Sequence, residues 1–184
     1  PILFDQENAV SLPNSIDING LNIESIKKIL SPNFITIDKL DPKAPLNEIH
    51  VGTIKENELE NYFTDLHSYL RPIFKDIAFD ISKTSNLQTI LKDSQIISDR
   101  YELAISKIKN MSVPSELKKF HESELNVVIA EADLYKKISE GGDDPLQAMM
   151  AIDILPKLST FYKDLRDYAS VFIYEHQLFK ELYN

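Results

Sequence analysis

The chain contains no cysteine and no tryptophan, and only four of its 184 residues are glycine. Without cysteine it forms no disulfide, no iron–sulfur cluster and no Cys-ligated zinc site. It also lacks a Gly-x-Ser-x-Gly turn and the Gly-rich turns that hold nucleotide phosphates. These absences predict a protein without catalytic residues and without a bound cofactor.

Long apolar runs and an excess of basic residues are also missing. No stretch of about 18 consecutive apolar residues occurs, so the sequence predicts no membrane-spanning helix. The net charge is −9, from 29 acidic and 20 basic residues, and the acidic residues are scattered along the chain. Such a surface repels nucleic acid and anionic lipid, so we expect a protein partner or self-assembly.

An initiator methionine is absent too, because the chain begins Pro1-Ile2-Leu3-Phe4. We expect that a secretion signal or a membrane anchor has been removed, in preference to loss of the methionine alone. Any association with a membrane would then depend on an anchor outside this sequence. Together with the lack of cysteine, this favours an extracytoplasmic location, at the bacterial cell surface or in the periplasm.

Residues 1–52 are predicted to form an irregular, Pro-rich N-terminal arm. Five prolines interrupt this segment, and an apolar stripe between Leu21 and Leu30, stopped by Ser31-Pro32, predicts one short helix. Phe34, Ile35 and Ile37 favour an extended piece. The arm has enough apolar residues to dock on the remainder of the chain.

Residues 53–184 are predicted to form four amphipathic helices. Helix-start signals occur at Thr53–Glu56, Ser85–Gln88, Pro114 and Asp144–Gln147. Apolar residues then recur at three- and four-residue steps, and Pro72 and Pro156 are expected to bend the first and last helices. We therefore predict an all-α fold, an up-down-up-down four-helix bundle with kinked long helices.

The helix that follows Pro114 carries three polar residues, His121, Glu124 and Glu131, on its apolar face. They can act as metal ligands or as a base–acid pair, or they can form a structural polar layer. Diiron bundles need Glu-x-x-His pairs, and the chain has none. We therefore predict a polar layer or a wet groove with no metal site. The hydroxyls of three tyrosines are its expected partners: Tyr69, Tyr101 and Tyr168.

Two other histidines lie on or beside apolar stripes. His67 and His176 are predicted to be interior imidazoles that donate a hydrogen bond to a carbonyl or a phenol. The aromatic residues near the C-terminus, which include Tyr168, Phe172 and Tyr174, are predicted to be core, with a docking surface as the alternative.

Residues 113–148 resemble a family of uncharacterised bacterial proteins. The similarity lies in Val113-Pro114-Ser115-Glu116-Leu117, His121, Leu125-Asn126 and Asp144-Pro145-Leu146-Gln147-Ala148. Members of that family, which we associate with candidate-phylum bacteria, are predicted to have an N-terminal membrane anchor and a helical extracytoplasmic domain. The resemblance implies a location outside the cytoplasm and implies no activity.

The sequence thus predicts a non-enzymatic extracytoplasmic helical domain that serves as an interaction or assembly module at the bacterial cell envelope. The alternative is a helical bundle that binds a small ligand or a metal between its helices.

Overall fold

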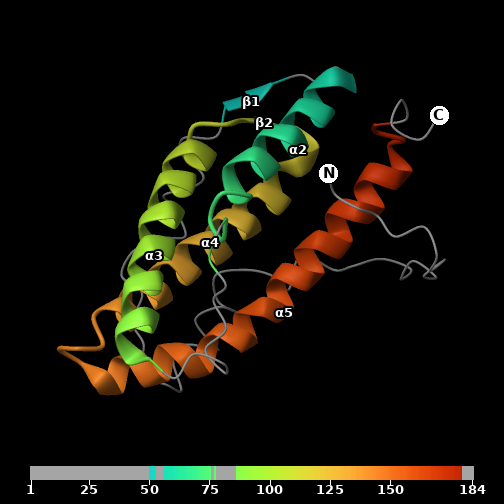
Figure 1. The fold of residues 1–184 in the computed structure, drawn as a ribbon. Helices are drawn as coiled ribbons and strands as arrows, with labels where there is room; N and C mark the ends of the chain where they lie inside the picture. Colours follow the sequence, from blue (N-terminus) through green and yellow to red (C-terminus); the bar gives the residue numbers. More distant parts are fainter. Residues whose placement is uncertain (1–49, 53–55, 76, 78–85, 180–184) are drawn as a thin grey trace.

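The structure is a computed structural model that describes residues 50–52, 56–75, 77 and 86–179 (Figure 1). These residues form four α-helices: α2 (Glu56–Leu70), α3 (Leu87–Lys109), α4 (Lys118–Ser139) and α5 (Pro145–Glu175). One 3₁₀ turn, η3 (Ser115–Leu117), precedes α4. The prediction of a mainly helical protein is therefore confirmed for these residues. Residues 1–49 of the predicted arm lie outside the described residues.

The structure adds a short strand pair that the sequence did not predict. Strand β1 (His50–Gly52) pairs in parallel with β2 (Ser112–Pro114), and Val51 lies opposite Val113. The end of the predicted arm is thereby joined to the segment between α3 and α4. Pro114 ends β2 and leads into η3, so the predicted helix start is three to four residues early.

Side-chain caps begin α3 and α5. The Asp144 side chain accepts a hydrogen bond from the Gln147 amide at 3.0 Å, as predicted, whereas α3 is capped by Asn86, whose side chain accepts from the Gln88 amide at 3.0 Å, one residue after the Ser85 that begins the predicted capping box. Each bond satisfies an amide that the first turn leaves free. Pro145 occupies the first turn of α5, where its missing amide hydrogen has no cost.

Proline has opposite effects in α2 and α5. The apolar pattern predicts that the first helix continues through Pro72, and this is wrong: α2 ends at Leu70 and residues 71–75 form turns. Proline cannot donate to the helix ladder and its ring crowds the preceding turn. Pro156, however, lies inside a continuous α5 of 31 residues, so it does not split that helix.

Helix α4 is the most enclosed of the four. It packs mainly against α3 and α5, and Figure 1 shows it running between them. Its buried residues cover more than one face of the helix, as in the run from Val127 to Ala130, which is buried throughout. A narrow outer face stays in contact with water and carries charged residues such as Lys119 and Lys136, which are exposed. A polar residue on the wide buried face must therefore find a partner inside the protein.

Side chains from all four helices form one continuous core. Tyr62 and Phe63 of α2 pack near Phe120 of α4, and Phe63 also contacts Phe172 of α5. The most enclosed aliphatic residues are Ile97, Ile108, Leu117, Leu125, Leu134, Ile138, Ile154, Leu158 and Leu165. None of the described helices combines the length and apolar character of a membrane-spanning segment.

Four apolar residues on the predicted stripes are instead exposed: Phe74, in the turns after α2, and three at helix starts. Leu87 is 63% exposed, and Leu146 and Met149 are each 68% exposed. All three lie in the first two turns of a helix, α3 or α5, where the neighbouring helices no longer cover the stripe. The stripe prediction is wrong at these positions.

The turn between α4 and α5 requires a glycine at one of two adjacent positions. A Cβ on Gly141 would lie 2.7 Å from the Ala148 Cβ and 3.2 Å from a Leu91 methyl, whereas a Cβ on Gly142 would meet nothing within 4 Å. Gly141→Ala should therefore lower the free energy of unfolding by about 1–3 kcal/mol through overpacking. Urea unfolding of both variants tests this. Gly142→Ala is the matched control and should unfold close to wild type; equal losses in the two variants would contradict the packing argument.

Candidate functional site

The three polar residues predicted on the α4 face are all buried. His121 is 1% exposed, Glu124 4% and Glu131 7%. Their burial follows from the position of α4 between α3 and α5. We call these three residues, with the tyrosines Tyr62, Tyr101 and Tyr162, the α4 polar cluster.

His121 is paired with a tyrosine of α2. Its Nδ1 atom and the Tyr62 hydroxyl lie 3.1 Å apart and share a hydrogen bond, and the two rings are in contact. Burial lowers the pKa of His121 to about 4. The imidazole is therefore neutral at physiological pH.

Glu131 is held by phenols from two other helices. The Tyr101 hydroxyl of α3 donates a hydrogen bond to Glu131 Oε2, and Tyr162 of α5 also hydrogen bonds to this carboxyl. Burial raises the pKa of Glu131 to about 7, and the two phenolic hydrogen bonds oppose that rise. Glu131 thus titrates near neutral pH while it links three helices.

Glu124 lies two helical turns before Glu131 on the same face of α4. Burial, and then repulsion by the Glu131 carboxylate, raise the pKa of Glu124 to about 8. The two carboxyls resist simultaneous ionisation, because each charge destabilises the other in a poorly solvated interior. At neutral pH the cluster favours a protonated Glu124.

A metal site does not follow from this arrangement. Among the described residues no group of three or more His, Cys, Asp and Glu side chains is placed to hold an ion. The partners of His121 and Glu131 are phenols, which suit hydrogen bonding better than ligation of divalent ions.

A pocket of about 370 Å³ opens beside Glu131. Glu131, Tyr101 and Tyr162 form its polar part, and His67, Arg71 and Phe74, which are exposed, form its mouth. The remaining lining residues are Leu70 and Ile73. We call this cavity the Glu131 pocket.

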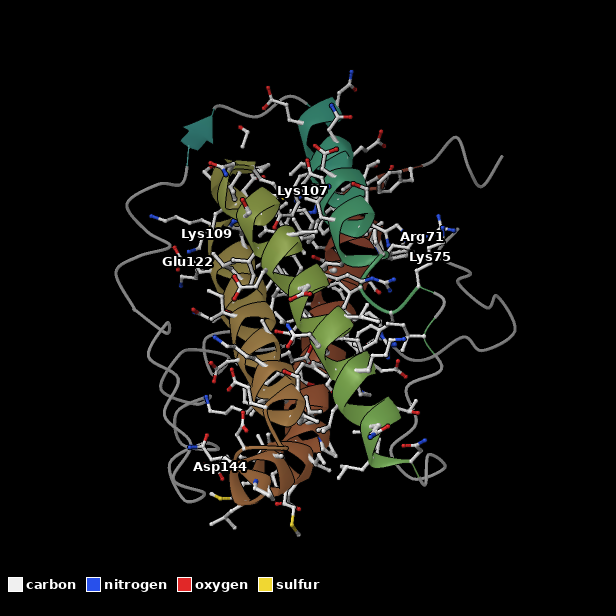
Figure 2. All side chains as sticks on the ribbon, turned by 60° about the vertical axis from the view of Figure 1, so that its left-hand side comes forward. Arg71, Lys75, Lys107, Lys109, Glu122 and Asp144 are labelled. Carbon is white, nitrogen blue, oxygen red and sulfur yellow. The ribbon has the colours of Figure 1, made fainter. Side chains whose placement is uncertain are left out.

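The mouth of the Glu131 pocket is built on a turn that α3 stabilises. The Arg100 guanidinium donates hydrogen bonds to the carbonyls of Pro72, Ile73 and Lys75 at 3.3, 3.2 and 2.6 Å. These bonds satisfy carbonyls in the turn that ends α2. Figure 2 labels Arg71 and Lys75 close together on this side of the molecule.

The sequence identified only part of this site. Of the three tyrosines expected as partners, Tyr101 is one, whereas Tyr69 lies under the Lys107 ammonium and Tyr168 stacks on Phe120. The actual partners, Tyr62 and Tyr162, lay on the predicted apolar stripes. A stripe shows which face of a helix is buried, but it does not show which residues of two packed helices lie side by side.

The two histidines predicted to be interior are exposed. His67 lines the mouth of the Glu131 pocket, so that prediction is wrong. His176 does contact a carbonyl, at 2.9 Å from Phe172 O, and stacks on the Phe172 ring, but it lies on the surface at the end of α5. Of the C-terminal aromatic residues, Phe172 is core and Tyr174 is 72% exposed.

No protein-family model, no curated protein and no solved structure matches this chain.

The pKa values of the α4 polar cluster predict how stability depends on pH. A carboxyl whose pKa is raised by folding stabilises the protein below its unfolded pKa, and this contribution is lost as the pH rises through the folded value. Glu124 acts in this way between about pH 4.5 and about pH 8, and Glu131 acts in this way between about pH 4.5 and about pH 7. His121 has the opposite effect between about 4 and 6.5. Two carboxyls outweigh one imidazole, so the free energy of unfolding should fall from about pH 5 to about pH 8.

Glu124→Gln should reduce that fall, by at most about 1.4 kcal/mol per pH unit. At acidic pH the amide should keep most contacts and change stability by no more than about 1–2 kcal/mol. Glu124→Leu removes the same charge and should exceed wild-type stability at the alkaline end. Urea unfolding across this pH range measures both effects, with the exposed Glu116→Gln as control. A wild-type stability that rises with pH would refute this account.

Proposed function

We propose that this chain is a non-enzymatic helical domain that binds a small molecule in the Glu131 pocket. The observation that carries the proposal is a buried carboxyl at the inner end of a pocket whose mouth is exposed. Binding pockets combine apolar walls with a few fixed polar groups that orient the ligand. Glu131, Tyr101 and Tyr162 are such groups, because hydrogen bonds between three helices fix them.

The phenols and the imidazole of the α4 polar cluster favour binding over catalysis. Burial raises the pKa values of Tyr101 and Tyr162 well above those of ordinary tyrosines, so both phenols hold their protons. A general acid or base works best with a pKa near the operating pH; Glu131, with a pKa of about 7, meets this condition, but the phenols paired with it do not. His121, the imidazole of the cluster, is enclosed next to Tyr62 and does not line the pocket.

We also propose that the domain acts at the bacterial cell envelope, outside the cytoplasm. The lack of cysteine and the family resemblance of residues 113–148 support this location. The brief connections from α3 to α4 and from α4 to α5 support an up-down-up-down arrangement of the helices. Fractionation of the producing cell tests the location, and recovery of the protein in the cytosol would contradict it.

A pocket-filling variant tests the ligand-binding proposal. Leu70 is half-buried and lines the Glu131 pocket, so Leu70→Trp should fill it. Screening a library of small molecules by ligand-observed NMR should find binders to the wild type that Leu70→Trp loses. Leu103→Trp is the matched control, because Leu103 is 66% exposed on α3 and lies away from the pocket. If every binder is retained by Leu70→Trp, the pocket is not the binding site.

A second candidate function is protein–protein interaction through the exposed apolar end of the molecule. Leu87 of α3 and Leu146 and Met149 of α5 lie at this end, where Gly141 contacts both helices. Exposed acidic residues Asp143 and Asp144 adjoin them, and Figure 2 labels Asp144 at this end of the helices. An apolar patch beside carboxylates fits a partner surface with apolar and basic side chains, and the like charges disfavour a second copy.

Photo-crosslinking in the producing cell tests this interaction. A crosslinker at position 149 should give a product with one other protein, and the yield should fall with salt because the charges contribute. The same crosslinker at position 103 should give no such product, because Leu103 lies outside this end. A product of twice the mass of the chain would identify self-assembly in its place, and no product at either position would contradict the interaction.

A further inference from the structure

The carboxyl of Glu131 retains hydrogen-bonding capacity toward the pocket. A carboxylate has two oxygens and about four acceptor positions, and the hydroxyls of Tyr101 and Tyr162 account for two of them. The remaining positions lie on a residue that lines the pocket. A ligand with a hydrogen-bond donor can therefore reach Glu131 without displacing either tyrosine.

The groups packed around Glu131 do not supply a positive charge. From α3 the facing group is Tyr101, from α5 it is Tyr162, and on α4 itself they are Tyr135 and Glu124. The basic side chains that line the pocket, Arg71 and His67, are both exposed. Within the described residues, no salt bridge to Glu131 is formed. Its ionised form therefore needs a cation from outside the protein.

The walls of the pocket suit an apolar body and a positive charge. Leu70 and Ile73 are aliphatic, and the Phe74 and Tyr101 rings meet edge to face with centroids 6.0 Å apart. Aromatic faces attract ammonium ions, most strongly where water is excluded. A cavity of about 370 Å³ is large enough for a ring or a short alkyl chain with one amine.

From this geometry we infer that the Glu131 pocket binds a small organic ammonium ion, with the ammonium group on the Glu131 carboxylate and the apolar body against Phe74 and Tyr101. The inference rests on the proposed ligand-binding function and names its ligand class. A carboxylate ligand would be repelled by Glu131, and a neutral alcohol would forgo the charge interaction. Because burial holds the pKa of Glu131 at about 7, binding below that pH releases the Glu131 proton to solvent.

Calorimetric titration of the full chain with three matched probes tests the inference: benzylammonium, benzyl alcohol and benzoate. Benzylammonium should bind at least about tenfold more tightly than benzyl alcohol, because hydrogen bonds to charged groups exceed neutral ones. Benzoate should bind most weakly. Glu131→Gln should remove the advantage of the amine over the alcohol, and Glu116→Gln, an exposed control, should keep it.

The pH dependence gives a second measurement that needs no change at Glu131. The affinity for benzylammonium should rise severalfold from about pH 6 to about pH 8, as Glu131 loses its proton, and the affinity for benzyl alcohol should stay constant. His67 also lines the pocket, so His67→Gln is the control and should retain the rise. A rise that His67→Gln abolishes would assign it to the imidazole and contradict the role of Glu131.

The outcomes separate this inference from the proposed function. If amine and alcohol bind equally and both are lost in Leu70→Trp, the pocket binds ligands but the ammonium class is wrong. If benzylammonium fails to bind while other molecules show Leu70→Trp-sensitive binding, the class is again wrong. If no molecule shows such binding, the proposed function fails together with the inference.

Discussion

Burial of the polar residues His121, Glu124 and Glu131 on the wide inner face of α4 is the constraint on which the rest of the structure depends. The face that carries them is covered by neighbouring helices, so these groups must find partners inside the protein. Tyrosines from three helices meet part of that requirement: Tyr62 pairs with His121, and Tyr101 and Tyr162 pair with Glu131. A tyrosine brings a large apolar ring to the core and one hydroxyl to a buried polar group, so it satisfies both demands at once.

The same constraint gives the two carboxyls their unusual titration. In water the pKa of either carboxyl would be that of an ordinary glutamate. Burial raises the pKa values of Glu131 and Glu124, and repulsion by Glu131 raises that of Glu124 further. Buried, ionisable groups that have no compensating cation reduce stability, and natural chains retain them chiefly where they serve binding or specificity. The energetic cost of Glu131 in the core is in this way connected with the binding capacity of the Glu131 pocket.

The periodicity of the sequence was sufficient to predict four helices and the position of three polar residues on the apolar face of α4, because a capping signal and an apolar stripe are local properties. Asn86 and Asp144 show this clearly, since their side chains cap the helices that they precede. Whether the three polar residues form a buried layer or a wet groove was left open. Which tyrosine contacts which glutamate depends on how helices that are distant in the sequence align along their axes, and no local pattern carries that information. The exposure of Leu146 and Met149 was missed because a stripe does not tell where its neighbours end. The pocket itself depends on the end of α2 at Leu70. The sequence predicted a bent helix through Pro72 and therefore missed this end.

The strand pair β1–β2 has a consequence for the order in which this chain acquires its structure. His50–Gly52 pairs with Ser112–Pro114, so the pair closes a loop that contains both α2 and α3. Bringing such distant segments together costs more chain entropy than docking α3 on α4, which follow one another directly. Contact order therefore favours early docking of α3 on α4 and late pairing of β1 with β2. A pulling force applied at residue 50 would act on the β1–β2 strand pair before it acted on any helix.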